Sequence, residues 1–505
     1  RAMRHQTHGQ RSTREGGEVS EVRPIGAVPV MAEMCTGRGA RGVAGAAAPA
    51  AAHIGASMFA LGGNAYDAVV AAALAETVLL PPKCGLAGDL VALGWRRGDE
   101  RPEALRAIGG APAGLPEVAS RGGLTATGPM SVGVPGAPAG YAALAERAVL
   151  DVATLAAPAI SLATEGFAWS RICTLLTDES TALLEEHNPE GTVYRPSGAS
   201  IAPGTVIGLP GLARALRHFA SGPATLLDGP VGQAIVDTVS RAGGILTSDD
   251  LRFSNAEWTE PAVGEDEQRT HFATPAPTHG PSLLDVMARL SGLRPSPRDV
   301  YRAVMDSIES RRTTLADPSG TSMVSAVDDE GTMVTVVHSN SFPRFGSGLV
   351  VPEFDLILSN RAGRGFDTDP DHPNFPRAGS RPATTLHAWA LATREGRRLL
   401  GATPGGANQM PWNAQSLARL QREPHNVAEA VVDARWEWLP DDDGIRVEAG
   451  FSQADLDGLE DAAPRVERVE RWGLRSAMQI IVDSGPGTSS IGVVDPRTGG
   501  AVCAI

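Results

Sequence analysis

The sequence predicts an α+β layered sandwich, because helix patterns and strand patterns occupy different parts of the chain. Up to residue 310, long segments rich in Ala and Leu carry helix signals and end at Gly or Pro. After residue 320, short runs of Val, Ile and Leu separated by turns are typical of strands. The chain has 505 residues, of which 42% are hydrophobic, so it can bury a large core.

The first half is expected to be mainly helical. Two apolar segments, 43–60 and 65–80, are separated by Gly62, Gly63 and Asn64. Gly and Asn favour the ends of helices, and the two prolines after the second segment cannot continue a helix. Further helices are predicted at 153–166, 212–219 and 231–242, and a strand followed by helices at 266–310.

Strand signals dominate the second half. Residues 321–328 and 333–337 flank an Asp-Glu-Gly turn, which predicts a β-hairpin. Later strands are predicted at 349–351, 356–358, 388–391, 399–402, 478–482 and 492–494, with helices at 412–420 and 428–435. An outer layer of helices over a central β-structure fits this order of elements.

The charge of the chain and its N-terminus exclude several kinds of partner. The net charge of −14 is interspersed along the chain, so we expect no nucleic acid partner. No segment reaches the roughly 18–20 apolar residues of a membrane span, so we expect no membrane partner. Residues 1–26 are polar and lack the apolar core of a secretory signal. We therefore expect a disordered lead at 1–26 and a cytoplasmic location.

Cysteine spacing and nucleotide-binding patterns give no sign of a cofactor. Cys35, Cys84, Cys173 and Cys503 have neither CxxC pairing nor metal-ligand spacing, and we expect them to be buried free thiols. The sequence also lacks a P-loop, an HExxH motif and a G-x-S-x-G elbow. We expect no metal and no cofactor, and a small-molecule substrate.

Thr321 opens the predicted hairpin and follows Gly320. A threonine hydroxyl is a weak nucleophile and needs a base close by. If the bond before Thr321 is cut, the freed α-amine has a pKa of about 7.7–8.0 and can accept the hydroxyl proton. Gly320 adds little steric demand to a strained scissile bond. On the local pattern alone, the start of an ordinary strand remains the better interpretation of Thr321.

Four blocks of sequence follow one another in the order seen in γ-glutamyltransferases, and the chain resembles that family over residues 43–500. The blocks are GGNAYDA at 62–68, GTSMVSAVD at 320–328, FGSG at 345–348 and PGG at 404–406. The ordered set carries the resemblance, rather than any single block. It implies a four-layer αββα sandwich of the N-terminal-nucleophile hydrolase type, in which Thr321 is the nucleophile.

The resemblance also implies self-cleavage between Gly320 and Thr321. Residues 27–320 would form a large-subunit-like region, and residues 321–505 a small-subunit-like region that begins with the nucleophile. The two fragments would associate as a heterodimer, and whether such heterodimers pair stays open. Thr313-Thr314 is the rival start of the second fragment, but the spacing to the later blocks favours Thr321.

The resemblance assigns roles to further residues. The N–H groups of Gly405 and Gly406 would hold the oxyanion of acyl transfer, although paired glycines also suit a plain strand-to-helix turn. Ser339 falls where the family has a hydroxyl residue near the amine of the nucleophile. The candidates for substrate binding are His338, Asn340, Asn360, Thr384 and Thr385.

Two departures from the family concern the groups that hold a glutamyl substrate. The position of the arginine that pairs with the substrate α-carboxylate holds Ile108, which cannot form a bidentate clamp. The stretch 359–365 lacks the carboxylates that hold the substrate α-amine. An anionic substrate could instead meet Arg361, Arg364 or Arg381, although arginines are commonly just solvated at the surface.

We therefore expect a self-processing hydrolase or acyltransferase of the γ-glutamyltransferase type that acts on an amide of a non-glutamyl small molecule, through an acyl-enzyme. One alternative is hydrolytic C–C cleavage in secondary metabolism, as in the alkylproline antibiotic pathways of some family members. Another is an uncleaved, inactive homologue with a binding role. An intact band on a denaturing gel would favour the last of these.

Overall fold

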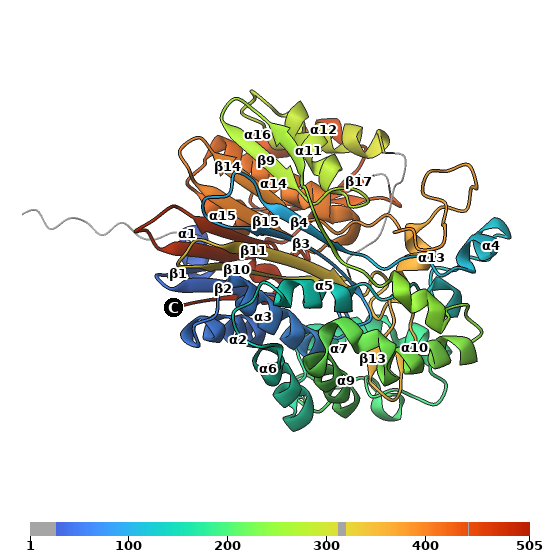
Figure 1. The fold of residues 1–505 in the computed structure, drawn as a ribbon. Coiled ribbons are helices and arrows are strands. Elements are labelled where there is room, and N and C mark those ends of the chain that lie inside the picture. Colours follow the sequence, from blue (N-terminus) through green and yellow to red (C-terminus); the bar gives the residue numbers. More distant parts are fainter. Residues whose placement is uncertain (1–26, 312–319, 443) are drawn as a thin grey trace, which may run out of the picture.

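Two stacked β-sheets form the centre of the protein (Figure 1). The computed structural model describes residues 27–311, 320–442 and 444–505. Each of the two sheets has seven strands, and helices cover the outer face of both (Figure 1). The layers therefore run helix, sheet, sheet, helix, which confirms the predicted αββα sandwich.

The first sheet holds the predicted hairpin at its centre. β10 (Thr321–Asp328) and β11 (Met333–Ser339) pair antiparallel, and both are buried along their whole length. The order of strands is β21 (Ala501–Ala504), β2 (Gly42–Ala46), β10, β11, β3 (Asp89–Trp95), β4 (Glu103–Ala107) and β7 (Glu257–Thr259). Among the described strands, β2 pairs with β10 from Val324 onwards, so residues 321–323 have a strand neighbour on the β11 side alone.

The second sheet packs face to face on the first. Its order is β1 (Thr36–Gly39), β20 (Ser490–Val494), β19 (Gln479–Asp483), β15 (Arg398–Ala402), β14 (Trp389–Thr393), β9 (Arg269–Ala273) and β8 (Ala262–Glu265). β19 lies against β10, and β15 against β11. Met323, Val337, Leu400 and Ile481 are buried between the two sheets. This apolar layer fixes the hairpin from one side.

The helices form two groups. The group on the first sheet is α2 (Pro49–Ala60), α3 (Ala65–Leu79), α5 (Ala137–Ala145), α6 (Val152–Glu165), α7 (Arg171–Glu179), α8 (Thr181–His187), α9 (Pro210–Ser221) and α10 (Pro230–Arg241). The group on the second sheet is α1 (Ala27–Met34), α11 (Gly280–Arg289), α12 (Pro297–Glu309), α14 (Gln409–Arg422), α15 (Val427–Val432) and α16 (Gln453–Ala462). Every residue of α3 is buried, because it lies between the hairpin and α6.

Smaller elements complete the structure. Two short helices, α4 (Leu115–Ser120) and α13 (Arg361–Gly365), lie near one end of the sheets (Figure 1). The minor sheets are β5 (Phe167–Ala168) with β6 (Val206–Ile207), β12 (Val350–Val351) with β13 (Leu356–Ile357), and β16 (Trp436–Leu439) with β17 (Gly444–Glu448) and β18 (Val466–Val469).

Both large sheets combine strands from before and after Gly320. In the first sheet, β2 lies between β21 and β10, and β11 lies next to β3. In the second sheet, β1 pairs with β20, and β9 pairs with β14. The two regions that the sequence separates at residue 320 therefore share one pair of sheets.

Most predicted elements are present with small shifts of their ends. The predicted strand 321–328 is β10, and the predicted helix 65–80 is α3, whose first N–H groups are capped by the Asn64 side chain. The helix predicted over 43–60 is wrong in its first part, because Gly42–Ala46 is strand β2. Its small residues serve close packing: a Cβ on Gly42 would lie 2.6 Å from the ring of Phe59.

All four cysteines are free thiols, as predicted. Cys84 and Cys173 are buried, whereas Cys35 and Cys503 are only half-buried, which corrects the prediction that all four are buried. Over the described ranges, no helix has both the length and the apolar character that crossing a membrane requires. The predicted disordered lead at 1–26 and the rival pair Thr313-Thr314 lie outside the described residues.

Candidate active site

Thr321 begins β10 and lies opposite Ser339, the last residue of β11. Opposite residues of an antiparallel pair direct their side chains to the same face of the sheet. Here the Thr321 hydroxyl donates a hydrogen bond to Ser339 Oγ over 3.2 Å, and both residues are buried. The fold therefore brings together two residues, 18 positions apart in the chain, that the sequence marks as catalytic.

The Ser339 hydroxyl connects Thr321 to the carbonyl group that precedes it. Ser339 Oγ donates to the Gly320 carbonyl oxygen over 2.9 Å and accepts from the N–H of Ser341 over 2.9 Å. A Cβ on Gly320 would lie 2.2 Å from the Ser341 carbonyl oxygen, so this conformation requires glycine at position 320. A hydroxyl, a hydrogen-bond donor and a carbonyl group thus meet at the predicted cleavage point.

Ser341 is a member of this site that the sequence does not single out. It is buried, and its φ of 73° lies in a region that non-glycine residues rarely adopt. Among the described residues, its hydroxyl has no hydrogen-bond partner. Backbone strain of this kind concentrates at functional sites. No sequence pattern indicates backbone strain at the end of a strand. The position of Ser341 two residues after Ser339 was therefore the only sign that it belongs to the site.

The next pair along the hairpin, Ser322 and His338, points to the opposite face, toward α3. Glu76 of α3 accepts from the Ser322 hydroxyl over 2.6 Å, and its Oε2 lies 2.9 Å from Nε2 of His338. Its Oε1 accepts from the N–H groups of Ala47 and Ala48. Each oxygen of this buried carboxylate therefore has two hydrogen-bonding partners. His338 lies on the face of the hairpin opposite to Thr321.

His338 has a second partner in Tyr141, whose hydroxyl lies 2.7 Å from Nδ1. Burial raises the pKa of Tyr141 well above its ordinary value, so the phenol stays neutral. Both ring nitrogens of His338 are thus occupied inside the core. The arrangement fits a structural anchor for the end of β11.

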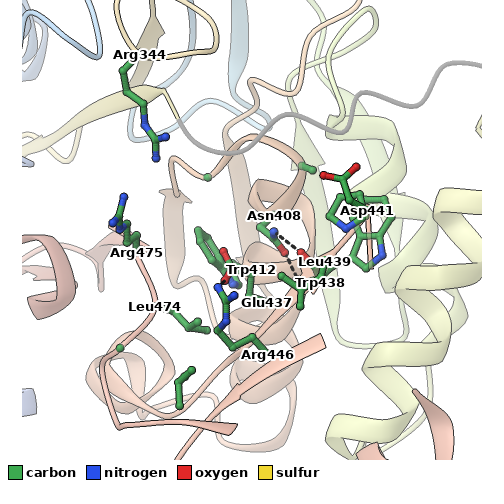
Figure 2. Close-up of a pocket in the computed structure, with 15 residues that line it drawn as sticks. Arg344, Asn408, Trp412, Glu437, Trp438, Leu439, Asp441, Arg446, Leu474 and Arg475 are labelled. Atoms are coloured by element: carbon green, nitrogen blue, oxygen red, sulfur yellow. Dashed lines mark hydrogen bonds and ion pairs between the residues drawn. The ribbon is translucent and has the colours of Figure 1, made fainter. Parts of the chain in front are cut away.

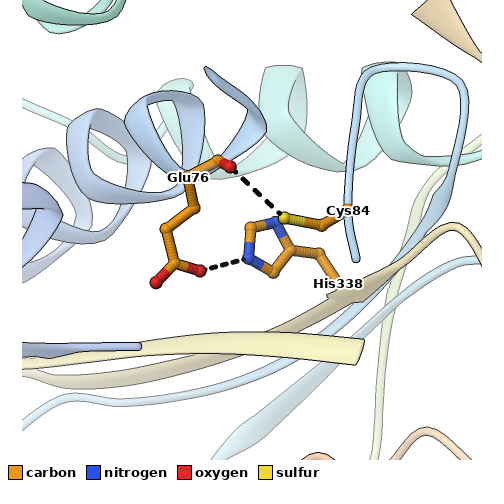
Figure 3. A group of neighbouring side chains, drawn as sticks. All are labelled: Glu76, Cys84 and His338. Atoms are coloured by element: carbon orange, nitrogen blue, oxygen red, sulfur yellow. Dashed lines mark hydrogen bonds and ion pairs between the residues drawn. The ribbon is translucent and has the colours of Figure 1, made fainter. Parts of the chain in front are cut away.

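Glu76, Cys84 and His338 form the one cluster in the described chain with the donor atoms of a metal site (Figure 3). The thiol of Cys84 faces the backbone carbonyl of Glu76 at 3.6 Å (Figure 3). Burial raises the pKa of Cys84 well above its ordinary value, whereas metal binding needs the thiolate. Because Glu76 is also saturated by other donors, we interpret the cluster as a hydrogen-bonded core.

Gly405 and Gly406 lie in the turn between β15 and α14. Their φ angles of 152° and 56° are both positive, and a Cβ on Gly405 would lie 2.5 Å from the ring of Trp412. Among the described residues, neither N–H donates a hydrogen bond to a backbone carbonyl. Free N–H groups in a glycine turn before a helix are suited to hold a negatively charged oxygen.

The other predicted binding residues are buried and have protein partners. Asn360 donates to the carbonyls of Ala126 and Phe342, and so fixes the loop after β11. Asn340 donates to the Pro81 carbonyl, Thr384 Oγ1 accepts from the N–H of Leu386, and Thr385 Oγ1 accepts from Gln409. Thr385 thus reaches the first turn of α14, next to Gly406, whereas Asn340 and Asn360 shape the loop that carries Ser341.

A sequence profile of the γ-glutamyltranspeptidase family matches residues 51–319 and, in an overlapping second match, residues 299–505. The chain belongs to this family. The oxamate amidohydrolase proenzyme of Klebsiella pneumoniae subsp. pneumoniae is 26% identical over 506 aligned residues, which cover 87% of this chain and 94% of the relative. The acylase ACY 1 proenzyme of a Pseudomonas species is 29% identical, covering 79% and 82%.

The fold is that of a solved acylase. The crystal structure of cephalosporin acylase from Bacillus halodurans superposes with a TM-score of 0.80 at 25% identity, and the match covers 93% of this chain and 97% of that one. This γ-glutamyltranspeptidase family member is therefore an N-terminal-nucleophile enzyme of the amide hydrolase or acyltransferase type.

The family's glutamyl-binding groups are absent from the positions that the sequence indicated. Ile108 is fully buried between the sheets. Arg361 is buried too, and its Nε lies 3.0 Å from the carboxylate of Asp89. Arg381 pairs with Glu257 at 2.9 Å, a contact that lowers the pKa of that carboxyl group. Arg361 and Arg381 are thus held by carboxylates of the protein itself.

Proposed function

We propose that this protein cuts itself between Gly320 and Thr321, and that Thr321 then cleaves or transfers the acyl group of a non-glutamyl amide. The observation that carries the proposal is the chain of hydrogen bonds from the Thr321 hydroxyl to Ser339 and from Ser339 to the Gly320 carbonyl. The word proenzyme in the names of both relatives agrees with maturation by cleavage.

These hydrogen bonds suggest how self-cleavage proceeds. Thr321 Oγ attacks the carbonyl carbon of Gly320 while its proton passes to Ser339 Oγ, and the Ser339 proton passes to the carbonyl oxygen. The proton on that oxygen then moves to the nitrogen as the C–N bond breaks, which re-forms the carbonyl, frees the Thr321 α-amine and leaves Gly320 bound to Thr321 Oγ as an ester. Water hydrolyses the ester, which gives the Gly320 carboxylate and returns the hydroxyl to Thr321. Regions 27–320 and 321–505 remain associated as a heterodimer, since their strands share both sheets.

Catalysis then uses the freed α-amine. With a pKa of about 7.7–8.0, this amine can take the proton of the Thr321 hydroxyl at neutral pH. The alkoxide attacks the amide carbonyl of the substrate, and the N–H groups of Gly405 and Gly406 hold the oxyanion. The leaving amine takes the proton, and water or a second amine accepts the acyl group from Thr321. No metal or other cofactor takes part in these steps.

A non-glutamyl substrate is supported by the two arginine positions. Buried Ile108 offers no charge to an α-carboxylate, and Asp89 already occupies Arg361. We expect no release of nitroaniline from γ-glutamyl-p-nitroanilide. Cleavage of that compound at a rate typical of the family would contradict this part of the proposal.

Mass spectrometry of the purified protein tests the nucleophile. The wild type should give two chains, 1–320 and 321–505, and Thr321→Ala a single chain without amidase activity. Thr321→Ser, which keeps a hydroxyl, should still cleave. The control is the double variant Thr313→Ala/Thr314→Ala, which should cleave normally. An unbroken but active wild type, or cleavage that depends on Thr313-Thr314, would rule out the assignment of Thr321.

A further inference from the structure

A pocket of about 490 Å³ opens beside the glycine turn (Figure 2). Gly405 belongs to its lining, and so does Arg344, which lies in the loop that begins after Ser339. Pockets that bind small molecules typically span about 300–1,000 Å³. The pocket therefore has the size of a ligand site, and it is bordered by two of the loops that form the candidate active site.

One side of this pocket is apolar and rigid. The ring of Trp412 packs against Gly405, because a Cβ on that glycine would lie 2.5 Å from the ring, and Trp438 also lines the pocket (Figure 2). Asn408 fixes the backbone of Trp438, since its side chain accepts from the backbone N–H of Trp438 over 2.7 Å and donates to the Trp438 carbonyl over 2.9 Å. Leu474 adds a further apolar surface. A flat ring placed here gains dispersion contacts and loses little freedom on the protein side.

The other side of the pocket carries excess positive charge. Arg344 and Arg475 lie together there, opposite Asp441 (Figure 2). Both arginines share the single carboxylate of Glu179, at 3.3 Å and 2.8 Å. Among the described residues, Arg344 Nε has no hydrogen-bond partner, although it is buried. Two guanidinium groups with one carboxylate between them can accept a second anion.

A third arginine of the pocket differs from these two. Arg446 lies 3.1 Å from Glu437 and 3.2 Å from Glu467, so two carboxylates neutralise it. The anion-binding capacity is therefore restricted to the Arg344 and Arg475 side. Asp441 on the far side repels an anion and favours the same orientation.

We propose that this pocket binds an aromatic group that carries a carboxylate, as part of the amide substrate, with the ring on Trp412 and Trp438 and the carboxylate on Arg344 and Arg475. The proposal rests on the proposed function for its link to catalysis, because Gly405 would hold the oxyanion next to the ring. The ligand class follows from the lining alone.

Calorimetric binding tests the pocket without any need for cleavage. The probes are 4-methylbenzoate and its neutral methyl ester. We expect the wild type to bind the acid at least tenfold more tightly than the ester, and Arg475→Gln to remove this preference. The Arg475 side chain is 47% exposed, so its replacement should leave the fold intact. Arg468→Gln, which replaces a similarly exposed arginine outside the pocket lining, is the matched control and should keep the preference. Equal binding of acid and ester by the wild type, or an equal loss in both variants, would overturn the proposal.

Rates of amide cleavage then test whether the pocket binds part of the substrate. The probes are 4-carboxyphenylacetyl-4-nitroanilide and N-phenylacetyl-4-aminobenzoate, each compared with its methyl ester. We expect one acid to be cleaved with at least tenfold higher kcat/KM than its ester, and Arg475→Gln to abolish this difference. If the acids bind but are not cleaved, and the chain stays intact, the role of Thr321 is contradicted and the binding site is still supported. If all four amides are cleaved without preference, the proposed role of the pocket is contradicted, and the role of Thr321 is still supported.

Discussion

Two neighbouring pairs of residues in one hairpin differ in how fully their polar groups are used. Ser322 and His338 are bound to Glu76 and Tyr141, so the Ser322 hydroxyl proton and both ring nitrogens of His338 are paired inside the core. One position away, the Ser339 hydroxyl has three partners, but the Thr321 hydroxyl bonds to Ser339 alone among the described residues.

This difference indicates that one face of the hairpin has a structural role and the other a chemical role. A buried and saturated network costs several kcal/mol to disturb, so it holds the end of the hairpin in place. A hydroxyl with few partners keeps its lone pairs for a reacting carbon. The same two strands thus present a fixed face to α3 and a reactive face to Gly320. The predictions below test that division.

The largest effect is expected at Glu76. Replacing it with Ala leaves His338 and Ser322 buried without an acceptor, and should lower the free energy of unfolding by about 3–5 kcal/mol. Urea unfolding followed by circular dichroism measures this. Glu76→Gln keeps the shape and the acceptor for the Ala47 N–H, and should lose less than half as much.

The conservative variant also tests the division itself. Glu76→Gln should still cut itself between Gly320 and Thr321, because Glu76 lies on the opposite face of the hairpin. If the thermal unfolding curve shows that the variant is folded, but the variant remains a single chain, the α3 face of the hairpin takes part in the cleavage. That result would contradict the division of the hairpin into a structural and a reactive face.

A somewhat smaller effect is expected at Ser339. Ser339→Ala removes the donor to the Gly320 carbonyl, and loss of one such donor slows related reactions by about 10²–10³-fold. The rate of conversion into two chains, followed on denaturing gels after synthesis, measures this. Ser339→Thr should restore it. The control is Ser325→Ala, which removes a buried hydroxyl of β10 that bonds to Thr335. Equal slowing in both alanine variants would point to a general effect of strand packing.

The smallest effect concerns another saturated histidine. His387 is buried, its Nδ1 donates to the Thr385 carbonyl, and its Nε2 accepts from Asn413. Burial lowers the pKa of His387 from 6.5 to about 4. The unfolded chain therefore binds a proton first as the pH falls, so stability that is present above pH 6.5 is lost between pH 6.5 and 4, by about 3 kcal/mol.

Urea unfolding at pH 7 and pH 4 checks this linkage. The wild type should lose about 3 kcal/mol more on acidification than His387→Gln, which cannot take up the proton. Equal losses in the two proteins would mean that His387 is not held neutral by its surroundings.

Much of the architecture was predictable because its signals are local. The strand at Thr321–Asp328 and the cap at Asn64 follow from neighbouring residues. β2 was mistaken for part of a helix, because Ala and Gly satisfy a helix pattern when the close approach of Phe59 is unknown. β3 and β4 were not predicted at all, because a fully buried strand such as Asp89–Trp95 lacks the alternation that marks a half-buried one.

The site shows the same limit more strongly. Thr321, Ser339 and the Gly405 turn were predicted from ordered blocks. Glu76 and His338 are 262 positions apart, and a lone carboxylate in an Ala-rich helix gives no hint of its partner. The sharing of Glu179 by Arg344 and Arg475 depends on three distant segments, so no pattern in the chain could have located the pocket.

The sharing of both sheets by strands from the two regions has a consequence for how the protein folds. We expect neither region to fold by itself, because β2 without β10, or β14 without β9, would present unpaired hydrogen-bonding edges that favour aggregation. We therefore expect both halves to fold as one polypeptide before the proposed cleavage between Gly320 and Thr321, and the two fragments to stay together afterwards until a denaturant separates them.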